Sequence, residues 1–133
     1  MNKYIPLSVP SINGNEWEYV KECLDTNWVS SAGAYVDRFE KEISRFTKAK
    51  YAVACSSGTS ALQVSLRLGG VESGDEVIVP KFSFLIYRIY SKANGAKIIY
   101  AKEDNYKISI KNILSNVTKK TKIVFLANPN NPT

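Results

Sequence analysis

Small polar residues cluster between Cys55 and Ser60, where a short apolar stretch gives way to helical spacing. A helix that begins there has backbone N–H groups without partners in its first turn, and its dipole favours negative charge. Gly58 lets the backbone approach a ligand closely, and Thr59 and Ser60 add hydroxyl groups. The pattern indicates either a phosphate site or a turn that only caps the helix.

Two further loops follow predicted strands and could hold a flat ring. Phe84 follows the apolar segment 76–80 and is either a cover for a heterocycle or an ordinary core residue. Asn128 and Asn131 follow another apolar segment, where they could hydrogen-bond a ring substituent or form a plain Asn-Pro turn. Loops after parallel strands emerge at one edge of a sheet, where such folds bind ligands. We therefore expect Thr59, Phe84 and Asn131 to surround one cavity.

Several other chemistries are excluded by residue types. The sequence has no histidine, so a Ser-His-Asp triad or a histidine-ligated zinc site cannot be built from it. The cysteines, Cys23 and Cys55, predict neither a disulfide framework nor a metal site. The serine-rich turn matches neither the GxGxxG fingerprint nor the GxxxxGKS/T P-loop. We expect no bound metal, Rossmann cofactor or P-loop nucleotide.

Hydrophobic spacing predicts the elements that position these loops. An extended arm is expected first, then two amphipathic helices, and then strands that alternate with helices. This order is typical of an α/β fold with three α-β-α layers and a largely parallel sheet. The helices are expected over about 16–28, 36–46, 59–68, 85–94 and 109–117, and the strands over 51–55, 76–79, 97–101 and 123–127.

The same pattern predicts two parts of the chain. Residues 1–48 are expected to form the arm and two helices, and residues 49–133 part of an α/β domain. Thr133 comes directly after the turn that follows the last predicted strand. We interpret the chain as a fragment whose α/β domain is truncated at its C-terminus.

Composition bounds the partners. The chain has 133 residues, of which 44% are apolar and 23% charged, as in a globular domain, and its net charge of +6 favours anionic partners. The densest basic cluster, residues 119–122, is either a set of solvated lysines after a helix or an anion or nucleic-acid surface. We expect no nucleic-acid partner. No apolar run is long enough to span a membrane and no secretory signal is visible, so a cytoplasmic location is expected.

Motifs at regular spacing carry a family resemblance. In the first part they are Ile5-Pro6-Leu7-Ser8, Gly14-Asn15-Glu16, Asn27-Trp28-Val29-Ser30-Ser31, Phe39-Glu40, Ser57-Gly58-Thr59-Ser60-Ala61-Leu62 and Gly74-Asp75-Glu76-Val77-Ile78-Val79-Pro80. Residues 5–80 are similar to the DegT/DnrJ/EryC1/StrS family of nucleotide-sugar aminotransferases, and most similar to its legionaminic-acid-pathway branch. Residues 81–133, with Phe82-Ser83-Phe84-Leu85-Ile86-Tyr87-Arg88-Ile89-Tyr90 and Asn128-Pro129-Asn130-Asn131-Pro132-Thr133, instead resemble histidinol-phosphate aminotransferase. The sequence therefore resembles one family before Pro80 and another after it, as if parts of two related proteins were joined there.

Both relatives are fold-type-I aminotransferases that depend on pyridoxal 5′-phosphate, so the chain resembles the N-terminal part of their large domain. The resemblance implies that Gly58, Thr59 and Ser60 hold the cofactor phosphate. It further implies that Phe84 stacks on the pyridine ring and that Asn131 contacts the ring 3′-oxygen.

The resemblance also implies a substrate pocket and a missing catalytic group. Trp28, Ser30 and Ser31 would border the substrate pocket, often that of the partner subunit. The Schiff-base lysine of such enzymes lies downstream of residue 133, so no catalytic residue is expected in this chain, and Lys81 is not a substitute.

The activity implied is transfer of an amino group from an amino-acid donor, typically glutamate, to a keto sugar attached to a nucleotide. The full-length enzyme is expected to be a homodimer, and this chain alone to be inactive. Histidinol-phosphate aminotransferase is an alternative of the same class. An alternative of another class is a non-catalytic remnant that binds phosphate weakly or only pairs with another chain.

Overall fold

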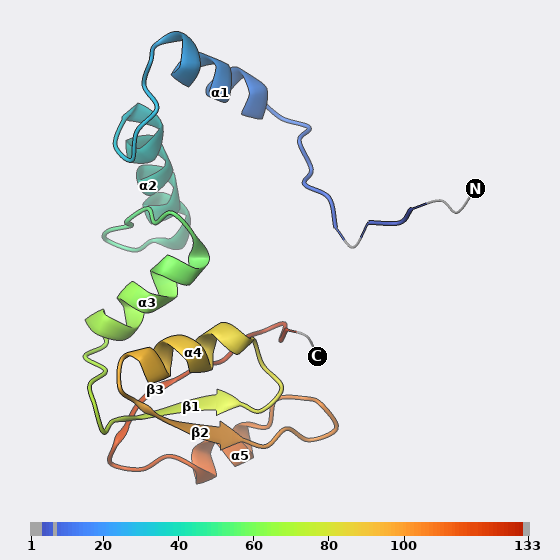
Figure 1. Ribbon diagram of the computed structural model, residues 1–133, viewed down its shortest axis with the longest axis vertical. Helices are drawn as coiled ribbons and strands as arrows, with labels where there is room; N and C mark the ends of the chain where they lie inside the picture. Colours follow the sequence, from blue (N-terminus) through green and yellow to red (C-terminus); the bar gives the residue numbers. More distant parts are fainter. Residues whose placement is uncertain (1–3, 7, 132–133) are drawn as a thin grey trace. The chain divides into compact units, whose positions relative to one another are not determined.

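The computed structural model describes residues 4–6 and 8–131. Leu7, Pro132 and Thr133, which belong to the sequence motifs, lie outside the described residues. The chain divides into two compact units, Met1–Ala54 and Cys55–Thr133. The helices are α1 (Glu16–Asp25), α2 (Ala34–Thr47), α3 (Gly58–Leu68), α4 (Leu85–Ala93) and α5 (Ile110–Ser115), and the strands are β1 (Glu76–Pro80), β2 (Lys97–Ala101) and β3 (Thr121–Val124) (Figure 1).

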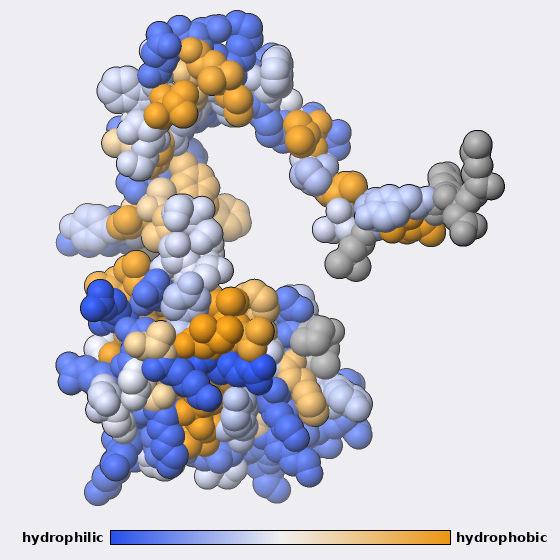
Figure 2. All heavy atoms as spheres, in the orientation of Figure 1, coloured by the Kyte–Doolittle hydropathy of each residue, from blue (hydrophilic) through white to orange (hydrophobic). Residues whose placement is uncertain are grey.

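The first unit holds α1 and α2, and neither helix has a buried residue. Aromatic and polar contacts link the two helices: the rings of Tyr19 and Tyr35 lie 5.1 Å apart, and the Tyr35 hydroxyl donates to Glu22 at 2.7 Å. Large apolar side chains on α2 stay exposed, among them Phe39 and Phe46. Figure 2 shows such hydrophobic surface in orange along this unit.

The second unit is built on a parallel sheet in the order β2-β1-β3. All of β1 is buried, so both faces of this central strand must be covered. Figure 1 shows α4 on one face of the sheet and α5 on the other. The α/β class, the parallel sheet and the three layers predicted from the sequence are confirmed.

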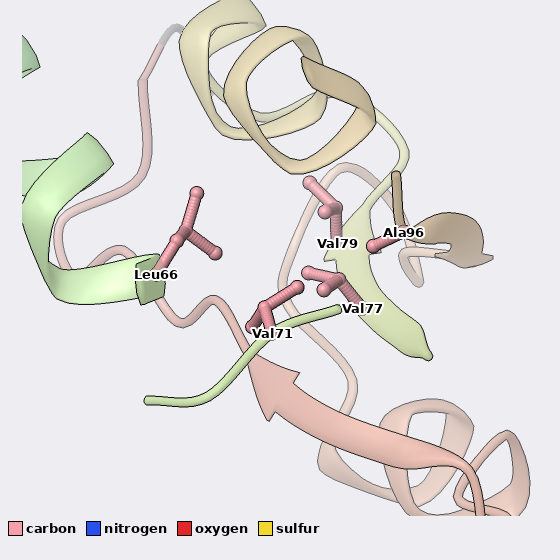
Figure 3. Close-up of a cluster of buried hydrophobic side chains, with 5 residues drawn as sticks. All are labelled: Leu66, Val71, Val77, Val79 and Ala96. Atoms are coloured by element: carbon pink, nitrogen blue, oxygen red, sulfur yellow. The ribbon is translucent and has the colours of Figure 1, made fainter. Parts of the chain in front are cut away.

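Successive residues of β1 point to opposite faces and build two separate cores. Val77 and Val79 meet Leu66, Val71 and Ala96 in the cluster shown in Figure 3. Ile78 packs on the opposite face with Ala101 of β2 and Ile113 of α5. Because each face buries its own cluster, a shift of β1 by one residue would exchange the two sets of side chains.

The strand expected over residues 51–55 is not formed, and this prediction was wrong. Tyr51 and Val53 are exposed, and the backbone N–H of Ala54 donates to the Glu40 carboxylate at 2.7 Å. That bond uses a donor that a strand would give to its neighbour. The apolar alternation of this segment is therefore not matched by a paired strand.

The last strand lies earlier than expected, over Thr121–Val124 in place of residues 123–127. The N–H of Phe125 still donates to the carbonyl of Ile78 at 2.9 Å, and residues 125–127 are not in a strand. The chain thus leaves the sheet soon after the level of Ile78. The helices and the other two strands lie where the spacing predicts them, within a few residues at their ends.

Truncating Ile78 should test how far the sheet depends on its central strand. Ile78→Ala empties a fully buried site, and we expect the free energy of unfolding of the second unit to fall by about 2 to 5 kcal/mol. Urea unfolding followed by circular dichroism measures this change. The control Leu114→Ala, on the exposed side of α5, should change it by less than about 0.5 kcal/mol. Equal losses in both variants would contradict the assignment of the core.

Candidate functional site

The start of α3 carries the predicted phosphate cradle. Ser57 caps the helix, its Oγ accepting the N–H of Ser60 at 3.2 Å, and the Ser60 Oγ lies 3.2 Å from that of Ser56. Over residues 4–6 and 8–131, no acceptor receives the N–H groups of Gly58 and Thr59. A Cβ added at Gly58 would meet no atom within 4 Å, so this helix end opens to space. Two backbone donors and several hydroxyls are therefore available to an anion.

The loop between β1 and α4 is held by polar groups from both neighbouring strand ends. The N–H of Phe82 donates to Oε1 of Glu103, which follows β2, at 2.7 Å. The hydroxyl of Ser83 donates to Oδ1 of Asn130, which follows β3, at 2.8 Å. Because the strands run parallel, their carboxyl ends bring residues far apart in sequence to this loop.

Phe84 lies at the end of this loop, immediately before α4, and it is 39% exposed. Its ring meets the edge of Tyr87 at 5.8 Å between centroids, and Tyr87 stacks on Phe125 at 4.5 Å. Phe84 is a member of neither buried cluster. Phe84 is therefore not a fully buried core residue, and part of its ring remains accessible at the carboxyl edge of the sheet.

The structure brings two of the three predicted loops together. Asn131 is exposed and follows Asn130, which is bonded to the loop that carries Phe84. No hydrogen bond, ion pair or ring contact within the described part of the chain joins Thr59 to Phe84 or Asn131. The expected convergence assumed a paired strand over residues 51–55, and without that strand α3 is not tied to the same sheet edge.

Two residues that hold this loop were not predicted from the sequence. Glu103 lies in the charged run 102–104 and resembles a solvated surface acid, whereas it is only 7% exposed. Asn130 stands between Asn128 and Asn131 and has no distinguishing neighbour in the sequence. The position of Glu103 just after a predicted parallel strand could have indicated that this acid lies at the carboxyl edge of the sheet.

A hollow of about 450 Å³ lies beside the loop after β3. Asn128 and Asn130 line it together with residues that follow β2. The hollow combines amide groups with apolar walls, an arrangement that suits a small polar ligand. Its walls are Tyr106, Lys107, Ile108, Ile110, Leu126, Ala127, Asn128, Pro129 and Asn130.

In the first unit, Trp28 and Ser30 border a second hollow, of about 460 Å³. The Trp28 indole N–H donates to the Ala32 carbonyl at 2.8 Å, which fixes the ring after α1. Gly33 is required beside it, because a Cβ there would lie 1.9 Å from the indole nitrogen and its φ is +147°. Ser31 is exposed and does not line the hollow. The residues that line this second hollow are Tyr19, Val20, Cys23, Leu24, Trp28, Val29, Ser30 and Tyr35.

The contact between Tyr35 and Glu22 changes the acidity of the phenol. Its hydroxyl donates to Oε2 of Glu22 at 2.7 Å. The hydrogen bond to the carboxylate favours the neutral phenol and raises the pKa of Tyr35 to about 12. The phenol is therefore a donor, and not a base, at neutral pH.

Two kinds of site are absent from the described ranges. No helix among residues 4–6 and 8–131 has the length and apolar character needed to cross a membrane. The same residues contain no group of three or more acidic or cysteine side chains arranged to hold a metal ion.

Comparison with known proteins decides the family. Residues 10–129 match the model of the DegT/DnrJ/EryC1/StrS aminotransferase family. The chain belongs to this family. The DegT/DnrJ/EryC1/StrS resemblance drawn from the sequence motifs is thereby confirmed.

Individual relatives include a putative sugar aminotransferase and a histidinol-phosphate aminotransferase, the two kinds of enzyme that the sequence suggested. GDP-perosamine synthase of Escherichia coli O157:H7 is 40% identical over 124 residues, which are 92% of this chain and 34% of that protein. Histidinol-phosphate aminotransferase of Pelagibacter ubique is 47% identical over 94 residues, which are 70% of this chain and 26% of that protein. A putative sugar aminotransferase from Streptococcus pneumoniae, solved in its PLP form, has a TM-score of 0.82 and 28% identity, covering 90% of this chain and 31% of that one. The chain spans about a quarter to a third of the length of these relatives.

Removing the charge of Glu22 should lower the pKa of Tyr35. We expect Glu22→Gln to move it from about 12 toward 10, because an amide neither repels the phenolate nor accepts as strongly. A tyrosinate absorbance titration measures the shift. The control Glu18→Gln, on the same helix, should leave the Tyr35 titration unchanged.

The same contact makes stability depend on pH in a defined window. The folded chain keeps the phenol protonated to a higher pH than the unfolded chain does. The contribution of the Tyr35–Glu22 hydrogen bond to the free energy of unfolding is therefore complete below about pH 10, and it is lost as the pH rises to about 12. A Tyr35 titration that is identical in wild type and Glu22→Gln would contradict the assignment.

Proposed function

We propose that this chain is the N-terminal part of a pyridoxal-phosphate-dependent aminotransferase. It would transfer an amino group from an amino-acid donor, typically glutamate, to a keto sugar attached to a nucleotide. The observation that carries the proposal is the family match over residues 10–129, together with relatives named as sugar aminotransferases. A homodimeric full-length enzyme that acts in the cytoplasm is part of the same proposal.

The start of α3 fits the phosphate of this cofactor. The unpartnered N–H groups of Gly58 and Thr59 are donors that a phosphate can accept, and the open space at Gly58 leaves room for its oxygens. The hydroxyls of Ser57 and Ser60 lie 3.0 Å apart and add further polar groups at the helix end. The residues present therefore suit the group on chemical grounds.

Each of the proposed site residues would have a separate role. Gly58, Thr59 and Ser60 would bind the phosphate, Phe84 would cover the pyridine ring, and Asn131 would donate to the ring 3′-oxygen. The bound cofactor would supply the carrier of the amino group and the electron sink for proton removal. This chain would contribute binding and orientation, since the lysine that attaches the cofactor is expected outside it. Trp28, Ser30 and Ser31 would border the sugar.

Histidinol-phosphate aminotransferase is the second candidate, favoured by the 47% identity of the Pelagibacter ubique relative. The two activities differ in their acceptor, a nucleotide-linked keto sugar or the keto form of histidinol phosphate. An assay of the complete enzyme with both acceptors and glutamate separates them. Turnover of the histidinol-type acceptor alone would overturn the sugar assignment.

The 133-residue chain should show no transaminase activity by itself. Because the attaching lysine is expected outside the chain, borohydride treatment with pyridoxal phosphate should give only scattered, substoichiometric labelling of its lysines. Peptide mapping by mass spectrometry measures the distribution. A stoichiometric adduct on one lysine, accompanied by turnover, would contradict this prediction.

A side chain at Gly58 should block the phosphate cradle without unfolding the chain. Gly58→Val places carbon atoms in space that is empty in the structure, beside the two free donors. In the complete enzyme we expect cofactor affinity to fall by about tenfold or more, the scale of lost hydrogen bonds to a charged group. Fluorescence titration with pyridoxal phosphate measures it.

The control for this variant lies in the same helix. Ser65→Ala removes a hydroxyl that is bonded within the helix to the Ala61 carbonyl, so cofactor affinity should not change. If Gly58→Val binds the cofactor as tightly as wild type does, the phosphate does not lie at the start of α3.

A further inference from the structure

Glu103 is a buried acid at the carboxyl end of β2. Its side chain has one hydrogen bond within the described residues, in which Oε1 accepts the N–H of Phe82 at 2.7 Å, while Oε2 is buried without a partner. Burial of a carboxylate with so few bonds opposes folding. A contribution to core stability therefore does not explain why a glutamate is buried at this position. Its hydrogen bond to the backbone of the neighbouring loop does explain it.

Asn130 contacts the same loop from the other side of β1. Its Oδ1 accepts the hydroxyl of Ser83 at 2.8 Å, and its Nδ2 lies 3.5 Å from the carbonyl of Phe82, at the long limit of a hydrogen bond. Because β1 is the central strand, the residues that follow its two neighbours hold its loop from opposite sides. We call Glu103 and Asn130 the loop clamp.

The loop clamp acts on the residues directly before Phe84. Within the loop itself, the N–H of Ser83 donates to the Pro80 carbonyl over a long 3.3 Å. Phe84 makes no side-chain cap to α4, and its ring contact is with Tyr87. The shortest bond to the backbone before Phe84 is thus that of Glu103 at 2.7 Å, compared with 3.0 Å from the Lys81 N–H to the Ala101 carbonyl. The short bond of Asn130 is to the Ser83 side chain.

We infer that Glu103 is a positioning residue, with Asn130 as its counterpart, and that it fixes the Phe82–Ser83 backbone so that the Phe84 ring is presented at the carboxyl edge of the sheet. A held aromatic ring loses less freedom when it stacks on a flat ligand ring. The link to a cofactor ring rests on the proposed function. The link between Glu103 and the loop rests on the hydrogen bond alone.

Amide hydrogen exchange of the 133-residue chain tests the clamp directly. Glu103→Ala should accelerate exchange at Phe82 by about tenfold or more, the effect of losing one bond to a charged acceptor, with β1 amides unchanged. Glu103→Gln keeps an acceptor and should stay within about threefold of wild type. Asp104→Ala removes the adjacent exposed acid and serves as the matched control. Equal acceleration at Phe82 and across β1 means a general loss of stability and overturns the inference.

A second measurement needs only the conservative variant. Replacing the carboxylate acceptor by an amide should shift the Phe82 amide proton resonance upfield in Glu103→Gln, because a hydrogen bond to a charged acceptor is the stronger one. Asp104→Asn should not move that resonance. An unchanged Phe82 resonance in Glu103→Gln overturns the inference even if Glu103→Ala fails to fold.

Cofactor binding in the complete enzyme separates this inference from the proposed function. Phe84→Ala and Glu103→Ala should both weaken binding of pyridoxal phosphate, by about fivefold or more, and Glu103→Gln should restore it. If Phe84→Ala weakens binding and Glu103→Ala does not, Glu103 does not position the ring. If Phe84→Ala has no effect, ring stacking in the proposed function is wrong, and the exchange data alone still support the clamp on the loop.

Discussion

The pairing of β1 on both of its edges is the constraint on which the second unit depends. β2 and β3 lie on either side of it, and the alternating side chains Val77, Ile78 and Val79 build a core on each face. Each of these fully buried side chains contributes on the order of 1.5 to 3 kcal/mol of hydrophobic stabilisation. The right-handed crossovers of a parallel sheet then place one helix layer on each face.

That same pairing determines where chemistry can occur. Parallel strands end at one edge, so the segments after β1, β2 and β3 meet there although the ends of β1 and β3, Pro80 and Val124, are 44 residues apart in the sequence. The loop after β1 carries Phe84, and the segments after β2 and β3 carry Glu103 and Asn130, which bond to that loop. Within the described residues, Oε2 of Glu103 is buried without a hydrogen-bond partner, which lowers stability, while Oε1 of the same carboxylate holds the loop through the Phe82 N–H.

The start of α3 obeys a different constraint. Its donors come from the helix geometry alone, since the first N–H groups of a helix lack partners whatever the sheet does. Cys55 begins the second unit, and residues 51–54 before it form no strand, as the Glu40 carboxylate accepts the Ala54 N–H. The free donors of Gly58 and Thr59 therefore depend only on the helix start, whereas their relation to Phe84 depends on pairing of residues 51–55, which the sheet formed by the described residues does not include.

The sequence by itself determined the helices, the central strand, the α/β class, the family, and the local chemistry of Gly58 and Thr59, because spacing, capping and turn residues act over a few neighbours. It also identified Phe84 as a residue at the sheet edge. Only the tertiary structure decided that residues 51–55 stay unpaired, that Glu103 is buried, and that Asn130 holds the loop before Phe84. Strand pairing and burial depend on contacts between residues that are distant in sequence. A charged run or an Asn-Pro turn has the same sequence whether its side chains are solvated or contact a neighbouring loop.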